Sequence, residues 1–449
     1  MYFYKNYVIK TYLEYNNINK AILKIFLFFS FVTITLYLKG DYFYFDSDIT
    51  KGSIKVGFWI NSIKYGGRER AIAILLNYLA KETYFTFYLI TSLGILEDEY
   101  FIPTNIKRIS LRIKKMNIFK VIEEENLDII VYNSYGKKEI RKLNKLQKTK
   151  IIYYDHSVFL FWIVIGNNFY NSIYQSYKKC KYVISLVPLE NDYLFKRWGI
   201  NSILMYNPQT FEYDLVKPSD LSSKNIIMIG RTDDVFKRFD LGIKAMKFII
   251  KEIPECKLNI IGSYNEPLER LIKRFHLENF IQFTGFHINI EKYLKSSSLH
   301  IFTSIAEAQP MVLSETKIFG IPTILCGLDY LALAKGGNVI IYDDSPKTIA
   351  KEAIKILKDD KFRKKLGKEA RKSMKKIRNN LIAKKWVKLL LSIYKDNNNL
   401  YTKLVSEDNK NKMKKKEAEI ILNNQLQLWT KRIHFFRNTN LDKVKSFFT

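Results

Sequence analysis

The sequence has little cysteine, proline or glycine, and each scarcity argues against a class of structure. With nine prolines and 18 glycines in 449 residues, the chain cannot be collagen-like or of low complexity. The cysteines lie far apart and form no Cys-x-x-Cys pair, which argues against a disulfide framework or structural zinc and favours a reducing compartment. They are Cys180, Cys256 and Cys326. The hydrophobic content of 47% is that of a globular protein, and the length favours two domains.

A long uninterrupted apolar run is also missing. The apolar segment 21–38 contains Lys24, and its unbroken part, 25–38, is shorter than the roughly 20 residues that a spanning helix needs. No small-x-small cleavage site follows it, which argues against a signal peptide. Three interpretations stay open for this segment: a membrane anchor, a helix lying in the membrane interface, or a helix packed on the protein itself.

Negative charge is scarce, since 74 Lys and Arg face 44 Asp and Glu, for a formal net charge of +30. Such a field attracts polyanions, which include nucleic acid, anionic lipid and phosphorylated small molecules. The basic residues are spread along the chain, and no DNA- or RNA-binding motif is present. Nucleic-acid binding therefore stays a less favoured alternative.

From Ile54 onward, short apolar segments alternate with amphipathic ones, which predicts an α/β fold with parallel, doubly wound sheets. A polar stretch after Asn207-Pro208 divides the alternation into two units, so we predict two Rossmann-like domains facing a cleft. The predicted strands are 54–60, 86–91, 128–132, 150–154 and 182–186, then 225–230, 257–262, 280–285, 299–304 and 321–326. The predicted helices of the second half are 240–251, 266–275, 289–296, 311–319, 346–358, 360–376, 379–395 and 406–437.

The same pattern sets the predicted boundaries. They are an apolar N-terminal extension at 1–52, a first domain at 53–210, a linker at 211–223, a second domain at 224–376, a cross-over helix at 377–395 and a basic helical tail at 396–449. The lysine-rich helix of the tail can be a solvated helix that packs locally, or a helix that binds a membrane surface or a partner.

The segment between strands 299–304 and 321–326 is the most informative for chemistry. Pro310 suits the first turn of a helix, which places Glu307 in the preceding loop and Glu315 about a turn and a half inside. Both carboxylates can then face the crevice at the carboxyl ends of the strands. Carboxylates suit sugar and ribose hydroxyls, while the first amides of the helix suit a phosphate. Those amides belong to Met311, Val312 and Leu313.

Three further groups of residues follow predicted strands. Gly230-Arg231 and Lys237 come after strand 225–230, where arginine can bind phosphate bidentately and lysine adds a point charge. Gly66-Gly67 lies in the loop after the first strand, and His156 follows strand 150–154.

Together these features resemble the retaining nucleotide-sugar glycosyltransferases of family 4, which have the GT-B fold. The resemblance runs from about Ile54 to Tyr394. It rests on the Glu-x7-Glu pair, on Gly-Arg-x5-Lys from Gly230 to Lys237, and on the Gly-Gly loop. It implies a glycosyltransferase that moves a sugar from a nucleotide-sugar donor, UDP-linked by expectation, to a glycan or lipid-linked acceptor in cell-envelope polysaccharide synthesis. It also implies retention of anomeric configuration.

The resemblance implies a role for each motif. Arg231 and Lys237 would hold the diphosphate, Glu315 the ribose and Glu307 the transferred sugar, while Gly67 would let the loop approach the diphosphate. His156 would lie beside the anomeric centre on the acceptor side. The expected catalytic residues are His156, Glu307, Arg231 and Lys237. The expected donor-binding residues are Gly66, Gly67, Gly230, Arg231, Lys237, Glu307, Met311, Val312, Leu313 and Glu315.

The sequence departs from the family at two positions. The family often has glycine after the first glutamate and after the lysine, where this chain has Ala308 and Arg238. Asp46-Ser47-Asp48 matches the Asp-x-Asp metal motif of the other major glycosyltransferase fold, but it precedes the first strand, so we interpret it as a polar linker. We expect no metal and no cofactor, because cations can replace a metal at the diphosphate.

The location follows from two conflicting arguments. Lysines precede the apolar segment and aspartates follow it, so a spanning helix would place the catalytic domains outside the cell. Nucleotide sugars are generally made in the cytoplasm. We therefore expect attachment to an anionic membrane surface on the cytoplasmic face; a single-pass membrane protein and a cytoplasmic protein are the alternatives. A catalytically weak sugar-nucleotide-binding subunit is the functional alternative.

Overall fold

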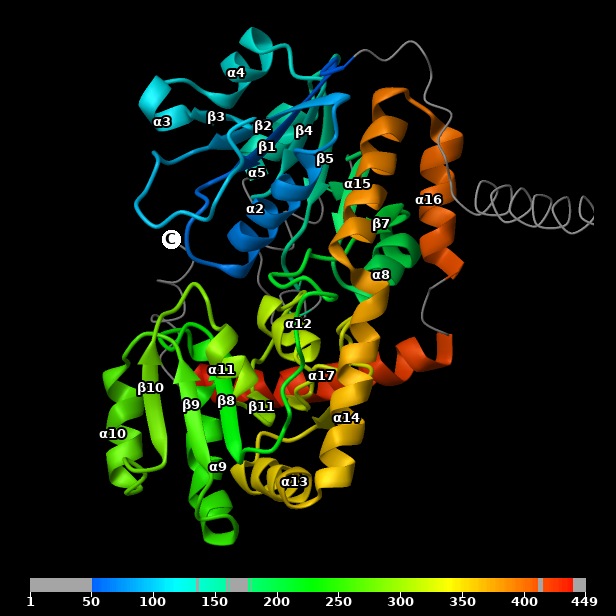
Figure 1. The fold of residues 1–449 in the computed structure, drawn as a ribbon. Coiled ribbons are helices and arrows are strands. Elements are labelled where there is room, and N and C mark those ends of the chain that lie inside the picture. The colour runs from blue at the N-terminus through cyan, green and yellow to red at the C-terminus, as the bar shows by residue number, and fades with distance from the viewer. Residues whose placement is uncertain are drawn as a thin grey trace, which may run out of the picture. The chain divides into compact units, whose positions relative to one another are not determined.

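The computed structural model describes residues 51–134, 137–158, 161, 177–178, 180–410 and 415–438 (Figure 1). The chain divides into one unit of residues 1–51 and a second of residues 52–449. The apolar segment 21–38 and the Asp46-Ser47-Asp48 motif lie outside the described residues. Among the described helices, none has the length and apolar character needed to cross a bilayer.

The first domain is built on a seven-stranded parallel sheet with the strand order β3-β2-β1-β4-β5-β6-β7. The continuous apolar run IKVGFWI makes β1 a strand buried on both faces, as the centre of a parallel sheet requires. The strands are β1 (Ile54–Ile60), β2 (Phe85–Thr91), β3 (Lys107–Ser110), β4 (Ile129–Tyr132), β5 (Lys150–Tyr154), β6 (Tyr182–Ser185) and β7 (Ser202–Leu204). The helices are α2 (Gly67–Leu79), α3 (Leu111–Lys114), α4 (Ile118–Glu124), α5 (Lys137–Leu143) and α8 (Pro188–Trp198).

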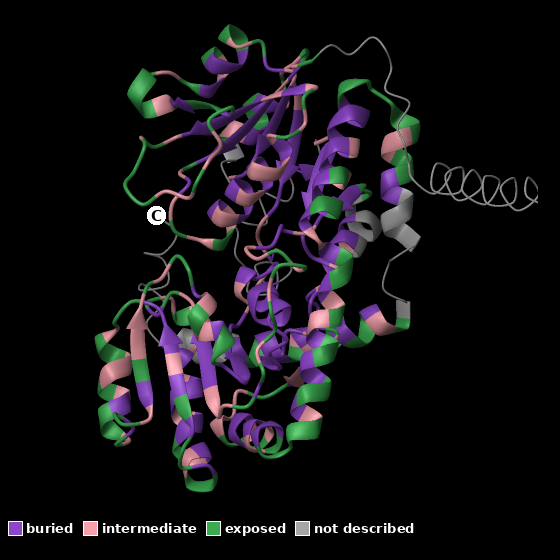
Figure 2. Cartoon of the chain, in the orientation of Figure 1, coloured by how far each residue is buried: buried purple, intermediate pink, exposed green. Residues whose placement is uncertain are grey.

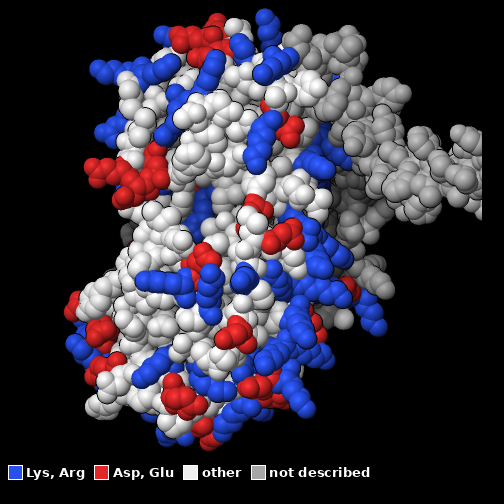
Figure 3. Space-filling model, in the orientation of Figure 1, with Lys and Arg blue, Asp and Glu red and all other residues white. Residues whose placement is uncertain are grey.

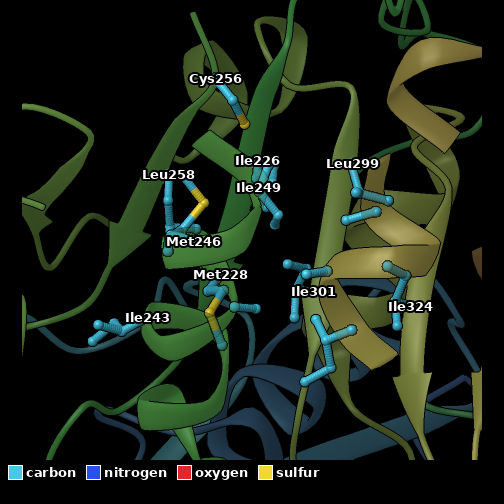
Figure 4. Packing of buried hydrophobic residues seen from close by; sticks show 14 of the residues in the cluster. Ile226, Met228, Ile243, Met246, Ile249, Cys256, Leu258, Leu299, Ile301 and Ile324 are labelled. Atoms are coloured by element: carbon cyan, nitrogen blue, oxygen red, sulfur yellow. The ribbon is translucent and has the colours of Figure 1, made fainter. Parts of the chain in front are cut away.

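The second domain has a six-stranded parallel sheet with the order β10-β9-β8-β11-β12-β13. In its core, the apolar face of α9 packs against the sheet. Met228, Met246 and Leu258 belong to this one hydrophobic cluster (Figure 4). The strands are β8 (Asn225–Ile229), β9 (Lys257–Ile261), β10 (Ile281–Gly285), β11 (Leu299–Phe302), β12 (Thr323–Cys326) and β13 (Asn338–Ile341). The helices are α9 (Phe239–Glu252), α10 (Glu266–Arg274), α11 (Glu291–Lys295), α12 (Met311–Ile318), α13 (Pro346–Lys358) and α14 (Asp360–Ser373).

Both sheets reverse their strand order at one point, which is where α/β proteins bind ligands. In the first sheet the reversal lies between β1 and β4, and in the second between β8 and β11. The loops that follow these strands are the ones that carry the Gly-Gly pair, Gly230 and Glu307. The two predicted Rossmann-like sheets are thereby confirmed, and the topology explains why the motifs follow these strands.

The C-terminal helices pack on different parts of the protein. Helix α15 (Asn379–Tyr394) contacts α2, and its Trp386 ring lies 5.8 Å from Phe58 and 5.3 Å from Tyr154. Helix α16 (Asn398–Lys410) contacts β7. Helix α17 (Lys415–Asn438) bonds to the second domain through Gln425 and Arg432.

Every predicted strand is present with ends within two residues, but three short edge strands, β3, β7 and β13, were not predicted. The predicted start of the last helix at 406 is wrong, because α16 already begins at Asn398; α17 covers Lys415–Asn438, and residues 411–414 lie outside the described residues. The predicted helix 360–376 ends at Ser373 and continues as a 3-10 turn, Met374–Ile377. Along α17 the buried positions recur at helical spacing, so this helix has a buried face (Figure 2).

Candidate active site

The loop after β11 and helix α12 place the two glutamates as the sequence predicts. Pro310 is the N-cap of α12, Glu307 lies in the loop before it, and Glu315 lies inside the helix. Glu315 is fully buried, whereas the Glu307 side chain keeps 15% of its surface exposed. A buried carboxylate is stable only when other groups compensate for its lost hydration, so the partners of Glu315 define its environment.

Glu315 is held by residues that sequence reasoning missed. Its Oε1 accepts hydrogen bonds from Nη1 of Arg70 at 2.6 Å and from Oγ1 of Thr210 at 2.5 Å. Burial acts to lower the pKa of Arg70, but Glu315 and Tyr100 together outweigh it and the pKa is raised, so the guanidinium keeps its charge. The second oxygen, Oε2, is buried and has no hydrogen-bond partner among the described residues. This oxygen is a buried acceptor that lacks a hydrogen-bond donor.

Lys237 and Glu307 form an ion pair through Nζ and Oε1. Both side chains remain partly exposed, Lys237 at 23%. The Arg231 side chain is 67% exposed and pairs with Asp234 at 2.8 Å. The structure therefore brings Lys237 to Glu307, and it places Arg231 on the same loop with a different partner.

The glycines mark the closest backbone approaches of the site. Gly66 (φ 138°) and Gly230 (φ 155°) have positive φ values that favour glycine. Gly67 is the first residue of α2, and a Cβ atom added there would lie 3.5 Å from Cγ of Met311. The N-termini of α2 and α12 thus meet, and both present amides with the positive end of a helix dipole. Of the three predicted amides, that of Leu313 donates to the Pro310 carbonyl at 3.2 Å.

His156 follows β5 in the chain. Its ring lies against that of Tyr154, with 4.0 Å between the centroids. Its Nε2 is 3.2 Å from Oδ1 of Asn133, and Nδ2 of Asn133 donates to the Val131 carbonyl, which fixes the amide. Nε2 is therefore the protonated nitrogen, and Nδ1 is a buried acceptor with no partner among the described residues. Burial and the nearby charge of Arg68 hold the pKa of His156 well below its ordinary value, so the ring is neutral.

The Asn207-Pro208 pair connects the first domain to the Glu307 loop. The amide of Asn207 donates to Oε1 of Gln309 at 2.7 Å, and its side-chain Nδ2 donates to the Gln309 carbonyl at 3.2 Å. The hydroxyl of Tyr154 donates to Oδ1 of Asn207 at 3.0 Å. These bonds link the strand that precedes His156 with the loop that carries Glu307.

The site thus offers cations, helix amides and carboxylates at one sheet edge. Cations and amides can bind a diphosphate, and carboxylates with an open acceptor can bind hydroxyls. No group of three or more His, Cys, Asp or Glu side chains suited to a metal occurs in the part of the chain that the structure describes.

Residues 212–373 match the model of the family described as glycosyl transferases group 1. Among curated relatives, the GalNAc-alpha-(1->4)-GalNAc-alpha-(1->3)-diNAcBac-PP-undecaprenol alpha-1,4-N-acetyl-D-galactosaminyltransferase of Campylobacter jejuni is 24% identical over 76% of this chain and 99% of its own length. The amylovoran biosynthesis glycosyltransferase AmsD of Erwinia amylovora is 25% identical over 72% of this chain and 96% of its own.

The fold is similar to those of solved glycosyltransferases. Sucrose-phosphate synthase from Thermosynechococcus elongatus aligns with a TM-score of 0.64 at 16% identity, over 76% of this chain and all of the other. HepE of Anabaena in complex with UDP-glucose aligns with a TM-score of 0.62 at 16% identity, over the same shares. At these identities the likeness shows the fold, which confirms the expected GT-B architecture.

The neutral state of His156 makes stability depend on pH. The unfolded chain binds a proton on this residue below about pH 6.5 and the folded chain does not, so stability falls as the pH drops below that value. We expect His156→Gln to flatten the decline between pH 7 and 5.5 by up to about 1.4 kcal/mol per pH unit. Urea unfolding at several pH values measures this slope.

His300 provides the comparison. It is buried at the second sheet with its pKa lowered to about 3, so His300→Gln should flatten the slope similarly. Only the His156 variant should also change activity. A wild-type slope in His156→Gln would contradict the neutral buried state.

Proposed function

We propose that this protein, whose residues 212–373 belong to the glycosyl transferases group 1, transfers a sugar from a UDP-sugar to a glycan or lipid-linked acceptor, with retention of configuration and without a metal. The observation that carries the proposal is Glu315 at the second switch point, with one oxygen bonded to Arg70 and the other, which is buried, without a donor. A ribose provides the hydroxyl donors that such an oxygen needs. Glu315 by itself would suit a protein that only binds a nucleotide-sugar. The Lys237–Glu307 pair adds groups suited to transferring the sugar.

The donor would lie across the carboxyl ends of β8 and β11. Lys237 and the exposed Arg231 would contact the diphosphate, together with the first amides of α12. Negative charge grows on the diphosphate as the sugar leaves, and fixed cations and amides stabilise that charge without reorganising. Glu307 would accept hydrogen bonds from sugar hydroxyls and holds the Lys237 ammonium beside the leaving group.

The acceptor would enter from the first domain. In our proposal His156, with a neutral ring and a buried Nδ1 that lacks a donor, accepts a hydrogen bond from a hydroxyl near the anomeric carbon. A neutral histidine suits this contact because it does not repel Lys237 and Arg231, the cations that we propose to contact the diphosphate. In our proposal the acceptor hydroxyl attacks on the face that the diphosphate leaves, and the leaving phosphate oxygen takes its proton.

The relatives support this substrate class. The Campylobacter jejuni relative is named for an undecaprenol-linked glycan and the Erwinia amylovora relative for a polysaccharide, so we propose a lipid-linked or cell-envelope acceptor here. The α-linkage in the first name agrees with retention from an α-linked donor. HepE, of like fold, is solved with UDP-glucose, which supports UDP as the nucleotide.

The two alternatives are less well supported. A binding-only subunit would not need the Lys237–Glu307 pair. A nucleic-acid-binding protein would gather its cations, whereas Figure 3 shows Lys and Arg spread over the visible face with Asp and Glu among them.

The donor site can be tested by single substitutions. A thermal-shift screen with nucleotide diphosphates and UDP-sugars first identifies the donor, since binding raises the melting temperature. Lys237→Ala and Arg231→Ala should each lower kcat on the order of 10²-fold if each cation stabilises the leaving group. Glu315→Gln should mainly raise KM for the donor.

Lys244→Ala is the matched control, because Lys244 also pairs with a carboxylate, Asp240, but lies on the body of α9. It should leave kcat and KM unchanged. Normal kinetics in Lys237→Ala, Arg231→Ala and Glu315→Gln would remove the assignment, and inversion of the product's anomeric configuration, seen by NMR, would remove the retaining mechanism.

Independence from metal is a separate prediction. Because cations and helix amides replace a divalent ion at the diphosphate, EDTA should leave the transfer rate essentially unchanged. Loss of activity in EDTA with recovery on adding manganese would contradict this prediction and make Asp46-Ser47-Asp48 a candidate metal site.

We also propose peripheral attachment to the cytoplasmic face of a membrane. The apolar segment 21–38 can dip into the lipid, and exposed lysines add about 1 kcal/mol each near anionic lipid. Deleting residues 1–50 should therefore move much of the protein to the soluble fraction, and high salt should increase the release of the full chain. Digestion of the catalytic domains by protease added to intact cells would contradict this orientation.

A further inference from the structure

The hydroxyl of Tyr330 bonds to both main-chain groups of Glu307. The amide of Glu307 donates to the hydroxyl at 2.9 Å, and the hydroxyl donates to the Glu307 carbonyl at 3.0 Å. One side chain therefore fixes the direction of the backbone from which the Glu307 carboxylate extends. Tyr330 is 1% exposed, and burial raises its pKa well above the ordinary value, so the hydroxyl keeps the proton that it donates.

Helix α17 holds Tyr330 from behind. The ring of Trp429, which is fully buried, lies 5.7 Å from that of Tyr330 in an edge-on contact. Nε2 of Gln425 donates to the Gly327 carbonyl and to Oδ1 of Asp329, both at 2.6 Å, so the helix is bonded to the segment just before Tyr330. Gly327 has φ 64°, and a Cβ atom there would lie 2.0 Å from Leu428, so the helix packs directly on this backbone.

Arg432 connects the same helix to the loops on both sides of the Lys237–Glu307 pair. Its Nη1 donates to the Ile305 carbonyl at 2.9 Å, two residues before Glu307. Its Nη2 lies 2.8 Å from Oδ1 of Asp344, and Asp344 also accepts from Nη1 of Arg238 at 3.3 Å. Arg238 directly follows Lys237 and reaches Arg432 through Asp344. Residues close to both partners of the ion pair are therefore connected to α17.

Trp429 also touches the first domain. The ring of Phe161 lies 5.6 Å from that of Trp429 and 6.0 Å from that of Phe236, the residue before Lys237. Both contacts are edge-on, which is a favoured arrangement of aromatic rings. Phe161, five residues after His156, thus contacts both Trp429 of α17 and the residue before Lys237.

We infer that Tyr330 is a positioning residue for Glu307, and that helix α17 holds it in place through Trp429. The inference rests on the proposed function, in which Glu307 contacts the transferred sugar. A carboxylate displaced by about 1 Å can lose much of its effect on the rate while the nucleotide part of the site is unchanged. Loss of the support should therefore lower kcat and leave the affinity for UDP as it was.

The experiment uses the full chain and three variants. Tyr330→Phe removes only the hydroxyl, Trp429→Leu removes the ring that contacts Tyr330, and Trp429→Phe keeps an aromatic edge there. Tyr153→Phe is the matched control, because that buried hydroxyl donates to a main-chain carbonyl, that of Ile140, in the first domain. Calorimetry with UDP gives Kd, steady-state assays with the UDP-sugar from the screen give kcat, and hydrogen–deuterium exchange follows peptides covering 303–310.

Tyr330→Phe and Trp429→Leu should lower kcat at least about tenfold, keep Kd for UDP within about twofold, and speed exchange at 303–310. Trp429→Phe should retain most of the activity, and Tyr153→Phe should change none of the three measurements. Unchanged exchange and kcat in Tyr330→Phe would overturn the inference, as would a drop in melting temperature alone. A wild-type protein that transfers no sugar would overturn the proposed function, whereas the exchange data would still decide whether Tyr330 positions Glu307.

Discussion

The buried carboxylate of Glu315 is the constraint on which the site depends. A carboxylate with no exposed surface is costly unless a cation and hydrogen bonds replace its hydration. Arg70 comes from helix α2 of the first domain, and Thr210 comes from the segment that follows β7. The second domain supplies the carboxylate and other parts of the chain supply its compensation. Removing Arg70 would leave the buried carboxylate without its cation, so the compensation of Glu315 requires both domains.

The pairing of Arg70 with Glu315 brings together the loop that carries Gly66 and Gly67 and the loop that carries Glu307. The N-termini of α2 and α12 meet where Gly67 approaches Met311, since a Cβ atom at 67 would lie in van der Waals contact with Cγ of Met311. Each helix starts at the edge where the strand order of its own sheet reverses. The bond between Arg70 of α2 and Glu315 of α12 joins the loops at the two switch points. Neither sheet would form this site by itself. The ion pair of Lys237 with Glu307 lies among these loops and keeps the lysine near the position proposed for the leaving group.

The sequence predicted the parts of the fold that are strongly patterned. The central strands are continuous apolar runs such as IKVGFWI, because both faces of a parallel sheet are buried. The edge strands β3, β7 and β13 escaped prediction since they have three or four residues and edge positions that require less apolar surface. The glutamates, the cations and His156 could be predicted as site residues because they follow predicted strands. Their partners could not, since Arg70, Asn133 and Tyr330 lie far from them in the chain and carry no local pattern.

The tail shows the limit of composition as a guide. The lysines along 406–437 left open a solvated helix that packs locally or a helix that binds a membrane surface or a partner, and the buried Gln425, Trp429 and Arg432 show that α17 packs one face on the protein. Gln425 and Arg432 are polar and lie beside the buried apolar Ile421 and Leu428, and their carbonyl and carboxylate partners compensate for their burial.

Arg238 completes this argument. The related family often has glycine at this position, and the backbone here has φ 51°, a value that glycine adopts without strain and that costs other residues on the order of 1 kcal/mol. The arginine side chain is nearly buried, at 9% exposure, and shares Asp344 with Arg432 of α17. Arg238 also pairs with Asp240, so two carboxylates compensate for the burial of its guanidinium group. Arg238 is thereby connected to Arg432 through Asp344, so the side chain at this departure from the family ties the cation loop to helix α17.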